Sequence, residues 1–159
     1  METPEFDLEL AYGKLKLKHG LPEFEKLAED FDVEKIEDKE SIFLIREIRR
    51  AVNEKVTAYL HLFETLINPN APPMFVFSIL RNSSDKNKDI VKEIYKILSK
   101  IQIETMKLDT VYNEDAEVKF INETFRTWQE LKLRIYKLIE NFETNLEENE
   151  TSQNRSYFD

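Results

Sequence analysis

The feature that most constrains the fold is a long amphipathic stretch over residues 116–146. Its apolar side chains recur at three- and four-residue intervals, which is the period of one face of an α-helix. On this face lie Val118, Ile121, Phe125, Trp128, Leu131, Ile135, Leu138, Ile139, Phe142 and Leu146. A helix of roughly 30 residues is about 45 Å long, which exceeds what the core of one small domain needs. The stretch therefore predicts a single long helix that packs within its own chain and also reaches neighbouring proteins.

Two earlier stretches have the same helical periodicity. Residues 41–67 form one, and residues 86–111 form the other, preceded at positions 82–85 by a run of N-cap residues. Residues 112–115 make a short acidic joint before the last helix, so we expect the last two helices to run antiparallel. The predicted fold class is therefore mainly α, a helical bundle with long antiparallel helices.

Proline marks the corner between the first two of these helices. The segment Asn68-Pro69-Asn70-Ala71-Pro72-Pro73 ends the first helix, because proline lacks a backbone donor and biases its predecessor away from helix. Residues 74–80 are strongly apolar, and Pro73 at a first helical position favours a short buried helix over a strand.

The beginning of the chain shows a different pattern. Between residues 6 and 17 apolar and charged side chains alternate, which is the period of a β-strand. Gly13 lies near the midpoint, where a tight turn requires a positive φ. We expect a small N-terminal β-hairpin unit, and the alternative is a short helix that ends at Gly20. Pro22 then suits the first turn of a short helix over residues 23–31.

These elements divide the chain into three parts. Residues 1–37 hold the β-hairpin and the short helix, residues 38–147 the helical bundle domain, and residues 148–159 an acidic polar tail that we expect to fray. Within the tail, Tyr157 and Phe158 form a candidate docking peptide, and a solvated chain end is the alternative.

The composition limits the class of function. Hydrophobic residues make up 41% of the chain and charged residues 35%, with only 2 glycines, which is typical of a mainly helical globular protein. A formal net charge of −9 repels nucleic acid and anionic membranes at long range, so we expect no tight direct DNA binding. There is no cysteine, no membrane-length apolar run and no basic leader at Met1. We therefore expect no membrane span and a cytoplasmic location, or a nuclear one in a eukaryote.

The sequence contains no recognisable catalytic, metal or cofactor motif. Both histidines, His19 and His61, lack the glutamate three residues earlier that a di-metal carboxylate bundle requires. Gly13 and Gly20 are the only glycines, so glycine-rich phosphate loops are excluded. We therefore expect no cofactor and no enzyme activity.

One local cluster is basic. Arg46, Arg49 and Arg50 alternate with apolar residues in the first long helix, a pattern typical of the solvent-facing side of an amphipathic helix. Contact with an acidic partner or a phosphate backbone is the alternative. In that case the chain is a small helical subunit of a nucleic-acid-bearing complex, such as a ribonucleoprotein.

The order of these parts resembles the GINS family of replication proteins, in particular the subunits in which a small β domain precedes the helical domain. The residues that carry the resemblance are Lys14-Leu15-Lys16-Leu17, then Leu21-Pro22-Glu23-Phe24 with Leu27-Ala28 behind it, and the joint Tyr112-Asn113-Glu114-Asp115. The family has a Leu-Pro-Leu-Trp-Leu-Ala stretch at the second of these places, so Phe24 stands where tryptophan is usual.

The resemblance implies a non-catalytic scaffold subunit of a heterotetramer. The implied partners are sister subunits, the replicative helicase, a nuclease-like protein and primase, and the long helices are then packing surfaces between subunits. Candidate partner-interface residues are Leu21, Pro22, Phe24, Phe125, Trp128 and Phe142. For the three on the last helix, packing in the core of the bundle is the alternative, and it is favoured over any ligand role.

Overall fold

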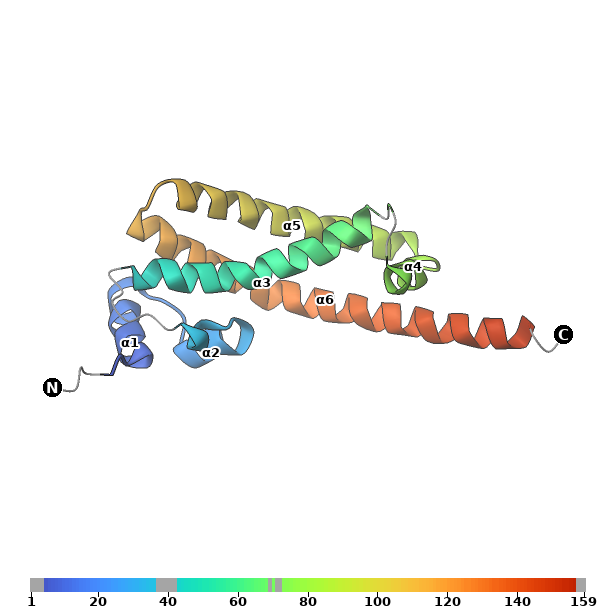
Figure 1. Cartoon of the computed structure of the whole chain (residues 1–159), viewed down its shortest axis with the longest axis horizontal. Helices are drawn as coiled ribbons and strands as arrows, with labels where there is room; N and C mark the ends of the chain where they lie inside the picture. Colours follow the sequence, from blue (N-terminus) through green and yellow to red (C-terminus); the bar gives the residue numbers. More distant parts are fainter. Residues whose placement is uncertain (1–4, 37–42, 69, 71–72, 157–159) are drawn as a thin grey trace. The chain divides into compact units, whose positions relative to one another are not determined.

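The computed structural model describes residues 5–36, 43–68, 70 and 73–156, and every helix in these ranges is drawn in Figure 1. No strand occurs among these residues, which confirms the mainly α class. The elements are α1 (Leu8–His19), α2 (Phe24–Asp30), the 3₁₀ turn η1 (Val33–Lys35), α3 (Leu44–Ile67), α4 (Met74–Leu80), α5 (Asp85–Thr110) and α6 (Glu114–Ser156).

The predicted N-terminal β-hairpin is wrong, and the alternative of a short helix ending at Gly20 is confirmed. The carboxylate of Asp7 accepts a hydrogen bond from the Leu10 backbone N–H at 3.1 Å and so caps the start of α1. Gly20, at φ 67°, ends the helix in the left-handed conformation, and its N–H donates to the Lys16 carbonyl at 2.8 Å. These two caps decide the structure, whereas the alternating apolar residues merely spread around the helix.

Helix α1 is held to the next segment through Tyr12. This side chain is 1% exposed, and its hydroxyl donates to the Pro22 carbonyl at 2.7 Å. Its ring meets Phe24 of α2 edge to face, with centroids 5.3 Å apart. Burial, followed by the negative charge of Glu23, raises the pKa of Tyr12 well above its ordinary value, so the hydroxyl remains a donor. The N-terminal unit is therefore a pair of short helices.

Contacts between Cα atoms group the chain into two compact units. The first comprises Met1–Ala58 with Lys100–Trp128, and the second comprises Tyr59–Ser99 with Gln129–Asp159. Three helices, α3, α5 and α6, are divided between the units, so that one part of each helix belongs to the first unit and the other part to the second. In the first unit, residues 111–113 join α5 to α6, and Figure 1 shows the chain running toward this joint in α5 and back from it in α6, so the two helices are antiparallel, as predicted.

Each unit has its own apolar core. The first is built around Leu27, Phe31, Ile48, Val52, Val56 and Ile121, all at most 1% exposed. The second is built around Phe63, Ile94, Leu98, Leu131, Ile135 and Leu138, all at most 3% exposed. The helical periodicity read from the sequence thus selects core residues in both units.

Two segments differ from their predicted state. Helix α4 begins after Pro73 as expected, but it is only partly buried, because Val76 and Ile79 alone of its residues are buried. Helix α6 continues to Ser156, so the expected frayed tail is helical from residue 148 to residue 156. Tyr157 and Phe158, the candidate docking peptide, lie outside the described residues.

Candidate functional site

The second unit exposes an unusual amount of apolar surface on α4. This helix has only seven residues, and Met74, Phe75 and Phe77 are 79%, 62% and 51% exposed. A helix of about two turns can bury only one stripe of side chains, so an apolar sequence such as Met-Phe-Val-Phe must expose the others. Isolated exposed apolar residues are common, but a cluster of this kind usually marks an interaction surface.

Phe75 contributes to a hollow that we call the apolar groove. The groove has a volume of about 310 Å³ and is lined by side chains of α3, α4 and α6. They include Leu62, Leu66, Phe75, Ile79, Ile139 and Phe142. Glu143 is its only ionisable lining residue, so an occupant would meet almost pure hydrocarbon. Leu62 and Ile139 are 39% and 49% exposed, which leaves the groove open to a partner.

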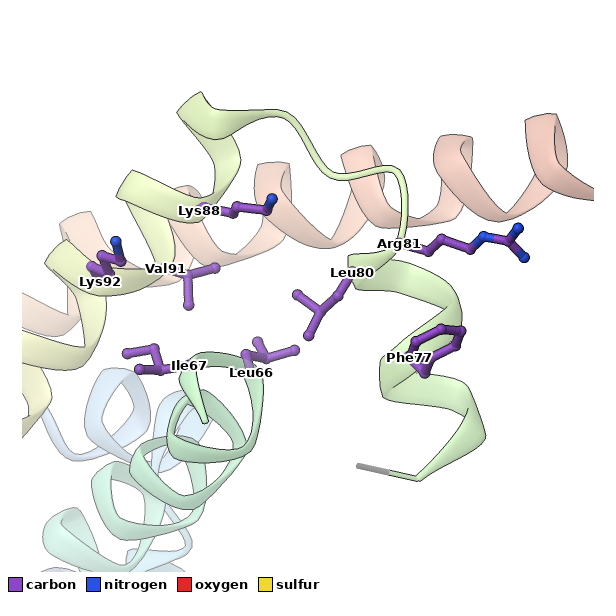
Figure 2. Close-up of a pocket in the computed structure, with 8 residues that line it drawn as sticks. All are labelled: Leu66, Ile67, Phe77, Leu80, Arg81, Lys88, Val91 and Lys92. Atoms are coloured by element: carbon purple, nitrogen blue, oxygen red, sulfur yellow. The ribbon is translucent and has the colours of Figure 1, made fainter. Parts of the chain in front are cut away.

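A second hollow, which we call the basic pocket, lies between α3, α4 and α5 and has a volume of about 360 Å³ (Figure 2). It is lined by Leu66, Ile67, Phe77, Leu80, Arg81, Lys88, Val91 and Lys92. In Figure 2 the side chains of Leu66, Leu80 and Val91 point toward the middle of the pocket, whereas Arg81 extends outward from its edge. Leu66 lines both hollows. The basic pocket combines an apolar floor with three cations.

Local hydrogen bonds fix the walls of the basic pocket. The Ser83 hydroxyl donates to the Ile79 carbonyl at 2.7 Å, which closes the turn after α4. The Ser84 hydroxyl accepts from the Asn87 N–H at 3.2 Å and caps α5, within the run of N-cap residues predicted at positions 82–85. These caps fix where α5 begins, and so they place Lys88 and Lys92, one turn apart on that helix, at the pocket.

The first unit contains a buried ionic cluster. Arg49 is 1% exposed and donates through Nε to Glu117, which is fully buried, at 2.7 Å. A terminal nitrogen of Arg49 donates to Asp109 at 2.7 Å. Burial by itself lowers the pKa of Arg49, but the hydrogen bonds to Glu117 and Asp109 outweigh it and raise the pKa above its ordinary value. The cluster is an internal ionic clamp that joins α3 to both α5 and α6.

The other two arginines of the predicted basic cluster are also engaged within the chain. Nε of Arg46 lies 3.5 Å from Glu117, and its guanidinium lies 4.8 Å from the centre of the Tyr112 ring. Arg50, half exposed, pairs with Glu47 at 3.1 Å. Arg49 is therefore paired inside the protein and does not lie on the solvent-facing side of the helix, and contact of the cluster with an acidic partner or a phosphate backbone stays a prediction.

The predicted partner-interface residues are placed mostly in the interior of the chain. Leu21, Trp128 and Phe142 are 4%, 3% and 6% exposed, and the Trp128 ring lies 6.0 Å from that of Phe31. Pro22, Phe24 and Phe125 are partly buried. Phe142 also lines the apolar groove, whereas the remaining side chains at the two hollows of the second unit are not among the predicted interface residues. The run Met74-Phe75-Val76-Phe77 and the pair Lys88 and Lys92 were their only signals in the sequence.

Neither a potential metal-binding group nor a membrane-spanning helix occurs among the described residues. Among them, no group of three or more His, Asp or Glu side chains could hold a metal ion. His61 contacts Glu64 at 3.3 Å, and His19 contacts Glu114 at 2.7 Å. No helix within the described ranges is long and apolar enough to cross a membrane.

Comparison of the chain with protein-family models, with curated proteins and with solved structures gives no match. Its function has to be argued from its own surfaces.

Proposed function

We propose that this protein is a non-catalytic scaffold subunit that holds another protein through the apolar groove and the exposed face of α4. The observation that carries the proposal is the 62% exposure of Phe75 beside an open groove of about 310 Å³. Burying an aromatic or aliphatic side chain of this size on a partner contributes roughly 1.5–3 kcal/mol. Phenylalanine and methionine, both exposed on α4, are among the residues enriched at protein interfaces.

The shape of the apolar surface favours an amphipathic helix of the partner as the occupant. Ile139 of the groove also ends a row of exposed apolar residues on α6, in which Leu133, Tyr136 and Ile139 recur at three-residue intervals and are 62%, 63% and 49% exposed. This row extends the apolar surface over about two turns of α6, inclined to the helix axis. A helix that presents apolar residues at the same period can cover such a strip and groove together.

The replication partners implied by the resemblance to GINS subunits stay a prediction. Residues 8–19 are helical, so the resemblance keeps only its Leu21-Pro22 helix opening and its Tyr112–Asp115 joint. The alternative of a nucleic-acid-bearing complex depended on the arginine cluster, of which Arg49 is enclosed by carboxylates.

The test is photo-crosslinking in the cells that make the protein. A photoreactive phenylalanine analogue at Phe75 is expected to crosslink one defined protein. The control places the same analogue at Leu17, which is 89% exposed and belongs to the first unit. A replicative helicase subunit as the product would confirm the expectation drawn from the resemblance. Position 75 giving no product beyond those of position 17 would refute the proposal.

The crosslinked partner is then purified and its affinity for the full chain is measured. Phe75→Ser combined with Ile139→Ser is expected to weaken binding at least tenfold, about 1.4 kcal/mol. Leu17→Ser removes a leucine that is even more exposed but lies outside the groove, and it should leave affinity unchanged. Equal effects of the two changes would show that the groove is not the binding surface.

A further inference from the structure

We infer that the basic pocket seats an acidic amphipathic segment of a partner protein, with an apolar side chain on the pocket floor and carboxylates on Lys88 and Lys92. This inference rests on the proposed function, because it names a second feature of the protein that the scaffold holds. The pocket is separate from the groove around Phe75, although Leu66 lines both.

The charge of the pocket contrasts with that of the chain. The whole protein carries a formal net charge of −9, yet the residues lining this hollow include Arg81, Lys88 and Lys92 and no acid. In the part of the chain that the structure describes, no carboxylate pairs with any of these three cations, although Asp85 and Asp89 precede the two lysines by three positions on α5. The local excess of positive charge is therefore available to a ligand.

The pocket floor narrows the chemistry of that ligand. Five of the eight lining residues are apolar, so a bare phosphate or a nucleic-acid backbone would leave most of the wall without a partner. A ligand that uses both features is apolar and anionic at once. Lys88 and Lys92 are one helical turn apart, about the distance between carboxylates at positions i and i+4 of a partner helix. Two carboxylates at this spacing favour a peptide over a fatty acid, which carries one.

The experiment selects ligands without assuming their sequence. The purified full chain is used to select binders from a random peptide display library, and the affinities of the selected peptides are then measured in solution. The expected peptides combine aspartate or glutamate with leucine, isoleucine or aromatic residues, and their binding weakens as salt is raised. A selection that yields no binder, or binders without acidic enrichment, would overturn the inference.

Two matched double variants test whether the selected peptides bind at the basic pocket. Lys88→Gln with Lys92→Gln is expected to weaken the selected peptides roughly five- to tenfold, because two solvent-accessible ion pairs are lost. Lys96→Gln with Lys100→Gln removes two exposed lysines at the same spacing on the same helix and should change affinity by less than about twofold. Equal losses in the two variants would overturn the inference, since charge alone would then explain binding.

Two further measurements separate this inference from the proposed function and from a lipid ligand. Phe75→Ser with Ile139→Ser should leave the selected peptides bound, because these residues line the groove and not the pocket. If the Lys88→Gln, Lys92→Gln variant binds the selected peptides as tightly as the natural chain while the crosslink at Phe75 persists, the inference about the basic pocket is refuted and the proposed function is not. Dodecanoate that displaces the peptides and binds more tightly than they do would assign the pocket to a fatty acid instead.

Discussion

At the scale of single residues, the ionic cluster of the first unit shows how the chain manages a buried charge. Moving Arg49 out of water costs several kcal/mol, and the cost is offset only because Glu117 and Asp109 lie on its donors at 2.7 Å. The guanidinium cannot relieve its burial by losing a proton, since its pKa is raised further. Each carboxylate that pairs with Arg49 is therefore expected to contribute more to the stability of the fold than an exposed carboxylate does.

Glu117→Gln is expected to destabilise the protein by about 3–5 kcal/mol, because it leaves the Arg49 charge in the interior with only Asp109 to balance it. The midpoint of urea unfolding measures the loss. Glu123→Gln, on an exposed position of the same helix, should cost less than about 0.5 kcal/mol. Replacing both charges, as Arg49→Met with Glu117→Leu, should recover most of the stability. A Glu117→Gln protein as stable as the Glu123→Gln protein would contradict the assignment.

Glu114 makes part of the stability depend on pH. Hydrogen bonds from Lys18 at 3.1 Å and from His19 at 2.7 Å lower the pKa of Glu114 below its unfolded value of 4.5. The contribution of this carboxylate is therefore complete above the unfolded pKa and is lost as the pH falls through the folded pKa. Melting temperatures of the natural chain and Glu114→Gln should differ at pH 7 and converge toward pH 3. A gap that stays constant over this range would exclude the linkage.

At the scale of elements, capping residues determined the secondary structure of the N-terminal segment, where the periodicity of apolar residues was ambiguous. The helices α3, α5 and α6 were predictable because their apolar stripes recur over many turns, and the caps at Ser84 and Pro73 have clear sequence signals. The β-hairpin predicted over residues 6–17 was wrong because alternation over two short runs is a weak signal. Asp7 and Gly20, by contrast, are residues suited to cap the two ends of a helix. The exposed α4 face and the basic pocket depend on how α3, α4 and α5 meet, which no local pattern encodes.

The two glycines test the helical assignment of residues 8–19. Gly20 has φ 67°, so Gly20→Ala is expected to destabilise by about 1 kcal/mol. Gly13 lies within α1, and an added Cβ meets nothing within 4 Å, so Gly13→Ala should stabilise by roughly 0.5–1 kcal/mol. Thermal unfolding of the two variants measures both effects. Loss of stability in Gly13→Ala would instead support a turn at this position.

At the scale of the whole molecule, three continuous helices take part in both compact units. Helices α3, α5 and α6 are 24, 26 and 43 residues long, and none is interrupted where one unit gives way to the other in sequence. Helix formation propagates cooperatively along a continuous backbone. Loss of one unit would therefore remove flanking helical turns from the other.

We accordingly expect the two units to unfold in one transition. Leu131→Ala, at a 2% exposed position of the second unit, should cost about 2–5 kcal/mol. The fluorescence of Trp128, the only tryptophan and a member of the first unit, should report the same lowered melting temperature as far-ultraviolet circular dichroism. Leu133→Ala, at a 62% exposed position, serves as the control. Two separate transitions would show that the units are independent.

The clamp on Arg49 also has a consequence for biosynthesis. Its two carboxylates come 60 and 68 residues later in the chain. During translation, the first half of α3 emerges from the ribosome before Asp109 and Glu117 have been made. At that stage Arg49 lacks the two carboxylates that pair with it in the folded protein. We therefore expect this helix to stay hydrated until Glu117 has left the exit tunnel, so that the first unit closes only after the start of α6 has been made.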